Sequence, residues 1–592
     1  MTRRIEPKSK LAKAVKNLEV VADQLMDVAK ALSEQEPATY PSTPIAEFAA
    51  AELEALPKVK GRKKAVEPKP KEEKPIYRTY EDFPYEKLVQ YAGLDCIATS
   101  GVLSTLFPAL VEEPTLTIAD PKTGVPKKVK GKAIIESVEN TEMLCHEFII
   151  SLEINGMRYD VDKNRAISRR MVAEIDEFED KIFSAIGKRI NLDSGVEVAN
   201  FLYNECGFVA PFQTKSGEPA VDGDALLTLA GLDPKANLYV ASNADLQFLA
   251  DMAKRKDINS VHNTFIKTYV EDFVKRDGRI HPSYNLHGTS SFRITGDNPN
   301  LTQLPRPKHG YNVRECYTVD SGNVFIAFDF SSAEVKILGA ICRDKNMLKA
   351  IAEGLDFHSF SASAMMGVPY DEYVHILEDK SHALQKEYKR MRQVAKTLTF
   401  SILYGSSAGG IAMQLSISKD EAERLMNMYF KAYPGVKDYI EESHNMAIWN
   451  QKVWTPFGQY KHEYAAHPVF KKTAVYNAAL RNAQNVRIQS ATSTLGLVVF
   501  AHLASEVERQ DPRNKAICTV YDSVEFEVPI ENAAQVINTA FYYMNDWPLQ
   551  YFDWLDLPIG VEGEIGFNWG EVEQVKPGVT QEEVEMILKG MR

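Results

Sequence analysis

The chain has 592 residues, of which 44% are hydrophobic and 25% charged, and its formal net charge is -12. This length and composition are those of an ordinary globular protein that divides into several domains. No apolar run approaches the ~18 residues of a transmembrane helix, and the N-terminus lacks the apolar core of a signal peptide, so we expect a cytoplasmic protein without membrane contact. The acidic average does not exclude nucleic-acid binding, because a basic groove can lie within an acidic protein.

The N-terminal part of the chain is predicted to be a helix on a tether. Apolar residues at mixed spacings of three and four, from Leu11 to Val28, predict an amphipathic helix within 1–36 whose apolar face needs a partner, such as another chain. Residues 37–75 are rich in Pro, Ala, Lys and Glu, a composition typical of a flexible linker. The basic run within it favours a solvated tether over a DNA contact, and both interpretations stay open.

The following stretch is expected to be globular but shows little chemistry. Residues 76–142 include Tyr91 and Asp95, which are four positions apart and therefore share one face of a predicted helix. Residues 143–275 are mostly helical by pattern. A polar segment dense in turn residues comes next, with Arg293 in its middle, and we expect it to be a surface loop of the kind that often carries function.

Two carboxylates interrupt apolar runs that are far apart in the sequence. Asp329 lies near the end of VFIAFDF, which predicts a buried strand, and a helix with Glu334 in its first turns is expected to follow. Asp522 lies between two β-rich runs that predict a hairpin. A buried carboxylate needs a cation, a metal or hydrogen-bond donors beside it. At adjacent strand ends the two would suit a pair of Mg²⁺ ions, with Mn²⁺ as a substitute, whereas a helix cap and a turn Asp are the alternative interpretation.

The segment RQVAKTLTFSILYG, between these carboxylates, places Arg392, Lys396, Phe400 and Tyr404 at every fourth position. On a helix these side chains form one stripe in which two cations lead to two rings. The stripe suits a nucleotide, because cations bind phosphate and a ring packs on a base. The same spacing occurs on amphipathic helices whose rings face the core, so the stripe alone leaves both interpretations open.

From about Glu147 to Trp569 the chain resembles the family A DNA polymerases, which include bacterial DNA polymerase I and several bacteriophage replicases. The segments DFSSAEVKIL, RQVAKTLTFSILYG and VYDSVEFEV are similar, in that order, to the family's first palm motif, fingers helix and second palm motif. The resemblance implies an α+β multidomain fold of the right-hand type, with a palm of antiparallel sheet plus helices, helical fingers and a helical thumb. It assigns the thumb to 143–275, the palm to 276–340 and, with a C-terminal tail, 501–592, and the fingers to 341–500.

The same resemblance implies a role for individual residues. Asp329 and Asp522 hold the metals, while Lys396 and Arg392 bind the triphosphate, and Lys396 is also the proton donor to pyrophosphate. The remaining implied roles are packing on sugar and base by Phe400, rejection of ribose by Tyr404 and Glu334, approach to the triphosphate by His358, minor-groove reading by Arg293, and template and primer contacts by Arg481, Asn485 and Gln489.

The resemblance also extends to Tyr91 and Asp95, which are similar to the third motif of a 3′-5′ exonuclease. That site needs further carboxylates from earlier strands, and only the helix and the linker lie upstream. We therefore expect 76–142 to be a remnant of an exonuclease-like domain. A separate exonuclease subunit, docked through the N-terminal helix, is the partner that this incomplete region suggests.

The chain departs from the family's pattern at several positions. The second palm motif usually reads His-Asp-Glu, whereas this chain has Tyr521, Asp522 and Ser523, so the usual Glu is missing. Thr399 and Ser401 stand where Asn and Gly are usual in the fingers motif, and we expect the selectivity of this chain to differ there. No metal ligand or phosphate-binding cation is lost, which predicts an active enzyme.

These inferences combine into a DNA-directed DNA polymerase that binds primer-template DNA and dNTPs and uses a two-metal mechanism. The compact length favours a bacteriophage replicase working in the cytoplasm of a bacterial host, without proofreading of its own. Two alternatives stay open. One is a family A RNA polymerase, which Glu334 disfavours; the other is a non-catalytic DNA-binding subunit of a replisome, which the missing Glu at Ser523 keeps open.

Overall fold

The computed structural model of the chain describes residues 115–119, 126–130, 141, 143–214, 216–234 and 238–591. The chain divides into two compact units, Met1–Asp95 and Cys96–Arg592, and all described residues belong to the second. The predicted N-terminal helix, the linker and the Tyr91 and Asp95 pair lie outside the described residues. The first two ranges form an antiparallel hairpin of β1 (Thr115–Ala119) and β2 (Pro126–Lys130).

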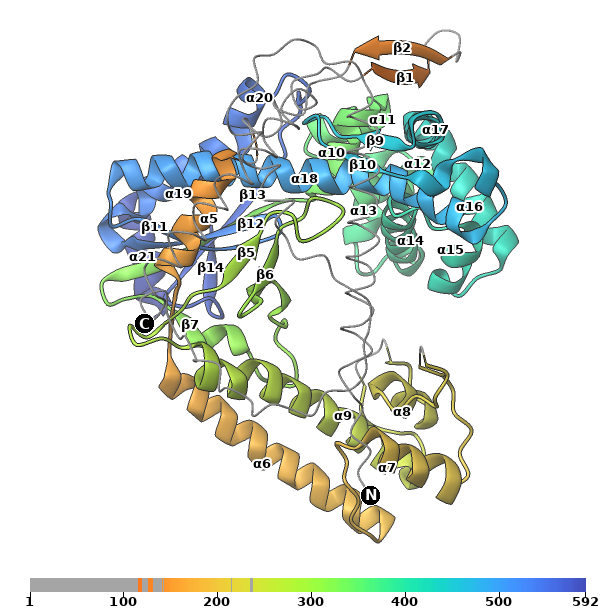
Figure 1. Ribbon diagram of the computed structural model, residues 1–592, viewed down its shortest axis with the longest axis vertical. Helices are drawn as coiled ribbons and strands as arrows, with labels where there is room; N and C mark the ends of the chain where they lie inside the picture. Colours follow the sequence, from red (N-terminus) through yellow and green to blue (C-terminus); the bar gives the residue numbers. More distant parts are fainter. Residues whose placement is uncertain are drawn as a thin grey trace, which may run out of the picture. The chain divides into compact units, whose positions relative to one another are not determined.

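The largest sheet of the described chain has five antiparallel strands in the order β11-β12-β8-β13-β14 (Figure 1). Along its middle strand, β8 (Asn323–Phe330), the even-numbered apolar residues pack in one cluster, and Phe325 and Ala327 pack in another. Both faces are therefore covered, which explains the continuous apolar run. The predicted α+β class with an antiparallel sheet is confirmed. The other strands are β11 (Lys515–Val520), β12 (Ser523–Pro529), β13 (Val561–Gly566) and β14 (Val572–Val575).

Helix α18 (Ala474–Gln510) connects this sheet with a group of helices (Figure 1). It packs against α5 (Met143–Asn155) and β11 of the sheet region, and against α10 (Ala333–Cys342) and α17 (Pro434–Asn450) among the helices. Of the helices in the described residues, α18 is long and apolar enough to cross a membrane, but 78% of its most apolar window is buried inside the fold. Such burial is typical of a core helix.

The helices between β8 and α18 lie mostly within 341–500, the segment predicted to be fingers, although α10 lies almost wholly in the predicted palm. Side chains cap several of them: Asp356 accepts a hydrogen bond from the Ser359 amide, and Ser418 accepts one from the Glu421 amide. These helices are α10 (Ala333–Cys342), α11 (Lys345–Ala352), α12 (Phe357–Met366), α13 (Tyr370–Glu378), α14 (Gln385–Leu403), α15 (Ala408–Leu415), α16 (Lys419–Ala432) and α17 (Pro434–Asn450).

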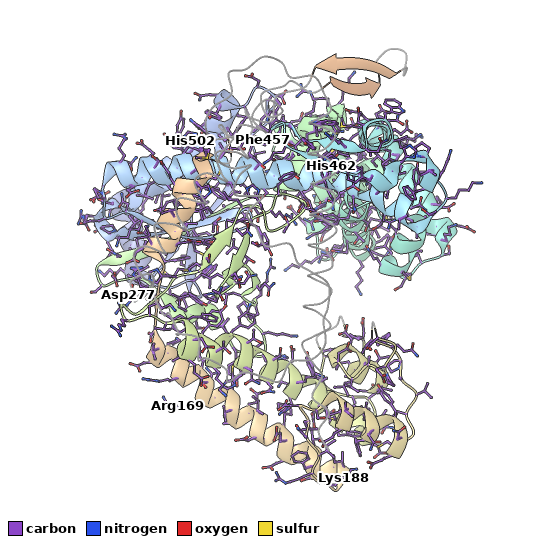
Figure 2. All side chains as sticks on the ribbon, viewed as in Figure 1. Arg169, Lys188, Asp277, Phe457, His462 and His502 are labelled. Atoms are coloured by element: carbon purple, nitrogen blue, oxygen red, sulfur yellow. The ribbon has the colours of Figure 1, made fainter. Side chains whose placement is uncertain are left out.

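The segment predicted to be the thumb is built on the paired helices α6 (Val161–Ile186) and α9 (Gln247–Val261). Buried residues recur at three and four spacing along α6, which Asp160 caps at its N-terminus and Gly187, at φ 73°, ends. Figure 2 shows Arg169 on this helix and Lys188 just beyond its end. The shorter helices are α7 (Gly195–Ala199) and α8 (Gly223–Leu229), and Asp222 caps α8 by accepting a hydrogen bond from the Ala225 amide.

The polar segment with Arg293 is more ordered than its composition predicts, so its interpretation as a loop is only partly right. It contains a hairpin of β5 (Ser283–Asn285) and β6 (Thr295–Asp297). Two hydroxyls of α18 hold its backbone, because Ser490 donates to the Ser291 carbonyl at 2.9 Å and Ser493 to the Phe292 carbonyl at 3.2 Å. A second small sheet, β4-β3-β7, flanks it, with β3 (Met157–Tyr159), β4 (Arg279–Ile280) and β7 (Tyr317–Thr318).

Candidate active site

The predicted hairpin brings Asp329 and Asp522 to adjacent strand ends. Strands β11 and β12 pair around a turn at Tyr521 and Asp522, and Tyr521 has a φ of 60°, the left-handed region. In the pairing of β12 with β8, Ser523 lies opposite Asp329. The amide of Phe330 donates to the Asp522 carbonyl at 3.1 Å, which fixes the turn beside the end of β8.

A cavity of about 410 Å³, which we call the carboxylate cavity, opens at these strand ends. Asp329 is exposed there, but partial desolvation, and then repulsion from Asp522 and three glutamates, raises its pKa to about 8. The site therefore holds more negative charge than its own cations neutralise. The lining includes the acids Asp329, Asp522, Glu525, Glu562 and Glu564, the cations Arg306 and Arg314, and Ser523.

The donor set of the carboxylate cavity suits a magnesium ion that is shared with a substrate. No three His, Cys, Asp or Glu side chains of the described residues are grouped closely enough to hold a metal ion by themselves. Mg²⁺ is commonly bound by one or two carboxylates and takes its other ligands from water and phosphate oxygens. Asp329 and Asp522 fit that pattern, and the raised pKa of Asp329 marks the charge that a cation would balance.

A second cavity, of about 180 Å³, shares the Tyr521 and Asp522 wall with the carboxylate cavity. We call it the insertion cavity. Glu334, from the first turn of α10, lies in it with Arg293 and Phe400. The structure thus brings together four residues that the sequence selected from four distant segments: Arg293, Glu334, Phe400 and Asp522. The rest of its lining is Ser332, Ala333, Val335, Thr492 and Ser493.

Glu334 is fixed by two neighbours in the insertion cavity. The Tyr404 hydroxyl donates to its Oε2 at 2.9 Å, and Arg293 Nη2 donates to its Oε1 at 2.5 Å. The Arg293 guanidinium also lies over the Tyr521 ring, 5.8 Å from its centroid. Arg293, predicted to read a minor groove, is therefore engaged with Glu334 in this structure.

The predicted stripe lies on α14, and Tyr404 is the C-terminal cap of this helix. The Tyr404 ring stacks on the Phe400 ring, with 6.5 Å between the ring centroids. Lys396 is exposed, whereas Arg392 makes a two-pronged ion pair with Asp356, at 2.7 and 3.0 Å. His358 lies beside the stripe, 5.9 Å from the Phe400 ring, and desolvation lowers its pKa to about 4. The imidazole is therefore neutral near pH 7.

The predicted DNA-contacting residues Arg481, Asn485 and Gln489 lie along α18, outside both cavities. Arg481 is exposed beside the end of α14: a Cβ on Gly405 would come within 2.7 Å of its Cγ. Sequence reasoning missed the neighbouring Gln484, whose Nε2 donates to the Ile402 carbonyl at 2.7 Å and ties α14 to α18. No local pattern marks such a contact between distant helices.

Two features of this region differ from what the sequence indicated. Thr399 and Ser401, expected to shape selectivity, are buried: Thr399 donates to the Ala395 carbonyl and Ser401 donates to Gln414 Oε1. They therefore pack and anchor α14 and line neither cavity, and their effect on selectivity stays a prediction. The glutamates of the carboxylate cavity were missed, although Glu525 could have been found by counting two residues along the strand from Ser523.

Comparison with known proteins agrees with this geometry. The family model described as DNA polymerase family A matches residues 161–571. The chain belongs to DNA polymerase family A. This range accounts for most of the predicted stretch of resemblance and confirms that resemblance.

Among relatives of this family A chain, DNA polymerase I of Chloroflexus aurantiacus is 26% identical over 504 residues, which are 84% of this chain and 48% of the relative. The thermostable DNA polymerase I of Thermus aquaticus is 27% identical over 421 residues, 71% of this chain and 46% of the relative. The chain thus spans about half the length of the curated relatives it matches. Among solved structures, the POL domain of Pol1 from M. smegmatis, in complex with DNA primer-template and dNTP, is similar with a TM-score of 0.62 and 25% identity, covering 73% of this chain and 70% of that one.

Proposed function

We propose that this chain is a DNA-directed DNA polymerase that extends a primer 3′ end with dNTPs on a template. The observation that carries the proposal is the shared wall at Asp522. Carboxylates line the cavity on one side of it, and Glu334 and Phe400 line the cavity on the other. A metal-bound phosphate and the sugar of the same nucleotide would then lie side by side. Membership of family A and the likeness to a polymerase solved with primer-template and dNTP support the proposal.

In the proposed reaction the primer 3′-oxygen bonds to the α-phosphorus while the bond to pyrophosphate breaks. Asp329 and Asp522 would hold two Mg²⁺ ions, which would lower the pKa of the 3′-hydroxyl, so that its proton passes to water, and would neutralise the triphosphate. Lys396 binds the triphosphate and gives a proton to the leaving pyrophosphate, and Arg392 joins it when released from Asp356.

The remaining predicted residues position the nucleotide and the DNA. Phe400 packs on sugar and base, and His358 approaches the triphosphate as a neutral imidazole. Glu334, held by Tyr404, fills the space that a ribose 2′-hydroxyl would need. Arg293, Arg481, Asn485 and Gln489 contact template and primer.

Primer extension tests this proposal. With Mg²⁺ and dNTPs the purified chain should extend a primed template, a chelator should stop the reaction, and added Mg²⁺ or Mn²⁺ should restore it. Folded chain that binds the template but extends nothing would favour the non-catalytic subunit. Equal extension with rNTPs would favour an RNA polymerase.

The biological setting is part of the same proposal. We place the chain in bacteriophage DNA replication in a bacterial cytoplasm, with proofreading supplied by a separate exonuclease subunit bound through residues 1–36. The purified chain should then leave a mismatched primer 3′ end intact. Digestion of that end by the chain alone, or failure of a 1–36 peptide to retain any nuclease of the same phage, would contradict this setting.

A further inference from the structure

Glu525 is a buried acid on the same face of the sheet as Asp329. Side chains alternate along a strand, so Ser523 and Glu525 of β12 face one side. The register places Ser523 opposite Asp329 and Glu525 opposite Ala327, one step further from the strand end. Glu525 is only 1% exposed, yet it lines the carboxylate cavity together with Asp329 and Asp522. It therefore stands directly behind the predicted metal ligands.

One carboxylate oxygen of Glu525 is held and the other is free. The Ser523 hydroxyl donates to Oε1 at 2.6 Å, whereas buried Oε2 has no hydrogen-bond partner among the described residues. Two neighbours act on this carboxylate without a hydrogen bond to Oε2: the positive charge of Arg314 and the buried Cys518 thiol. The Arg314 guanidinium itself donates to the Leu304 carbonyl at 3.4 Å and lies over the Trp569 ring, and its buried Nε has no hydrogen-bond partner among the described residues. An unpartnered buried carboxylate oxygen is costly, so Oε2 indicates a donor beyond the hydrogen bonds that the described residues form.

The position of Glu525 in the sequence relates it to the unusual serine at position 523. Ser523 stands where the second palm motif of family A usually has Glu. Side chains two residues apart on a strand point to the same face, so Glu525 shares the face of Ser523. Glu525 thus supplies a carboxylate to the face that Ser523 leaves without one, and the serine hydroxyl orients it.

We propose that Glu525, oriented by Ser523, is a positioning residue for the metal site, and that its Oε2 accepts a hydrogen bond from water bound to the cation at Asp329. Mg²⁺ keeps several of its waters in proteins, and these waters are donors that need acceptors. Acceptors behind the direct ligands commonly set metal affinity. The inference rests on the proposed function, because it requires Asp329 and Asp522 to bind the ion.

The test is Mn²⁺ binding to the full-length chain without DNA, measured by electron paramagnetic resonance. Glu525→Gln keeps an acceptor for Ser523 but puts an amide donor at the free position, so Mn²⁺ affinity should fall by about tenfold or more. Ser523→Ala should weaken binding in the same direction, because the carboxylate loses its orientation. The double variant Ser523→Glu, Glu525→Val should bind Mn²⁺ more tightly than Glu525→Gln, because position 523 then supplies the carboxylate to the same face.

Glu564→Gln is the matched control. Glu564 also lies opposite Ala327 and lines the carboxylate cavity, but its Oε1 accepts from Gln574 at 2.8 Å. If only the summed charge of the cavity mattered, Glu564→Gln and Glu525→Gln would weaken Mn²⁺ binding equally, which would overturn the inference. Wild-type affinity in both Glu525→Gln and Ser523→Ala would overturn it as well. If Glu525→Gln does not fold, as judged by thermal melting, Ser523→Ala decides.

Asp329→Asn separates this inference from the function on which it rests. Loss of Mn²⁺ binding in Asp329→Asn with wild-type binding in Glu525→Gln would leave the proposed metal site intact and remove only the role of Glu525. Full Mn²⁺ binding in Asp329→Asn would instead refute the metal assignment itself.

Discussion

Desolvation and then repulsion from neighbouring acids raise the pKa of Asp329, so its ionised form lowers the stability of the metal-free chain. Neighbouring acids repel it, and no ion pair of the described residues involves it. Asp329→Asn should therefore lower primer extension by about 10²–10³-fold or more while the melting temperature of the metal-free chain stays equal or rises. Extension rates and thermal melting of the same preparations check this.

Asp320→Asn is the matched control for that variant, because Asp320 accepts from Arg279 at 3.0 Å and lies outside both cavities. It should lower the melting temperature and leave extension near wild type. Near-normal extension by Asp329→Asn would contradict the role given to this carboxylate.

Glu334 is expected to discriminate between deoxyribose and ribose. Glu334→Ala opens the insertion cavity and should raise the ratio of ribonucleotide to deoxynucleotide incorporation by roughly 10–100-fold. Tyr404→Phe removes only the 2.9 Å hydrogen bond that fixes Glu334, so a smaller rise in the same ratio should follow. Competition between rNTPs and dNTPs in single-nucleotide extension measures it, and an unchanged ratio in Glu334→Ala would remove the assignment.

Arg392 of α14, one of the two cations predicted to bind the triphosphate, is paired with Asp356, the cap of α12. The Arg392–Asp356 pair is partly exposed, with side chains 38% and 39% accessible, so it contributes at most about 1 kcal/mol. Asp356→Asn retains a capping side chain for α12 but weakens the pair. The KM for dNTP should therefore fall by up to about fivefold, in steady-state extension assays. A raised KM would indicate that the pair helps to form the binding site.

A charge contact between Asp257 of α9 and the distant pair Lys308 and His309 should make stability depend on pH in the acid range. Partial burial raises the pKa of Asp257, but hydrogen bonds from His309 and Lys308 outweigh this effect and lower the pKa to about 2. A depressed carboxyl pKa stabilises the fold above the unfolded value near 4, and the gain is lost as pH falls toward 2. Asp257→Asn should cost roughly 2 kcal/mol at pH 7.

Urea unfolding at two pH values checks this contact. The stability difference between wild type and Asp257→Asn should shrink by about half at pH 3, because the unfolded Asp is then protonated. A difference that stayed constant between pH 7 and pH 3 would show that the charge of Asp257 does not matter.

Elements with a strong local pattern could be predicted from the sequence, and contacts between distant elements could not. Strand β8, the hairpin around Asp522 and the stripe on α14 follow from alternation and helical spacing, so Asp329, Asp522 and Phe400 were identified in advance, whereas the glutamates of the carboxylate cavity were not. The engagement of Arg293 with Glu334 and the burial of Thr399 depend on packing between segments. The hydrogen bond between Ser523 and Glu525 was missed because it depends on both side chains pointing to the same face of β12.

Binding of primer-template DNA should be strongly salt-dependent although the net charge is -12. Local cations displace counterions from DNA whatever the average charge, and each phosphate contact adds about 0.9 to the slope of log affinity against log salt. Arg481→Gln should lower that slope by about one. Fluorescence anisotropy at several salt concentrations measures it.

Arg509→Gln is the control for the salt series. Arg509 lies at the other end of α18 and is paired with Glu506 at 2.7 Å. The slope of log affinity against log salt for Arg509→Gln should equal that of wild type. Equal slopes for Arg481→Gln and wild type would exclude Arg481 from the DNA contacts.

The position of β8 in the middle of the sheet has a consequence for synthesis of the chain. Its partners β12 and β13 lie on either side of it, and the register joins Asp329 to Ser523, about 190 residues later. At roughly 5–20 residues per second, a ribosome needs about 10–40 s to make that interval. During this time an apolar strand has been translated and neither neighbour exists. A nascent chain that stalls before Ser523 therefore exposes a strand with two unpaired edges, which is where aggregation during expression should begin.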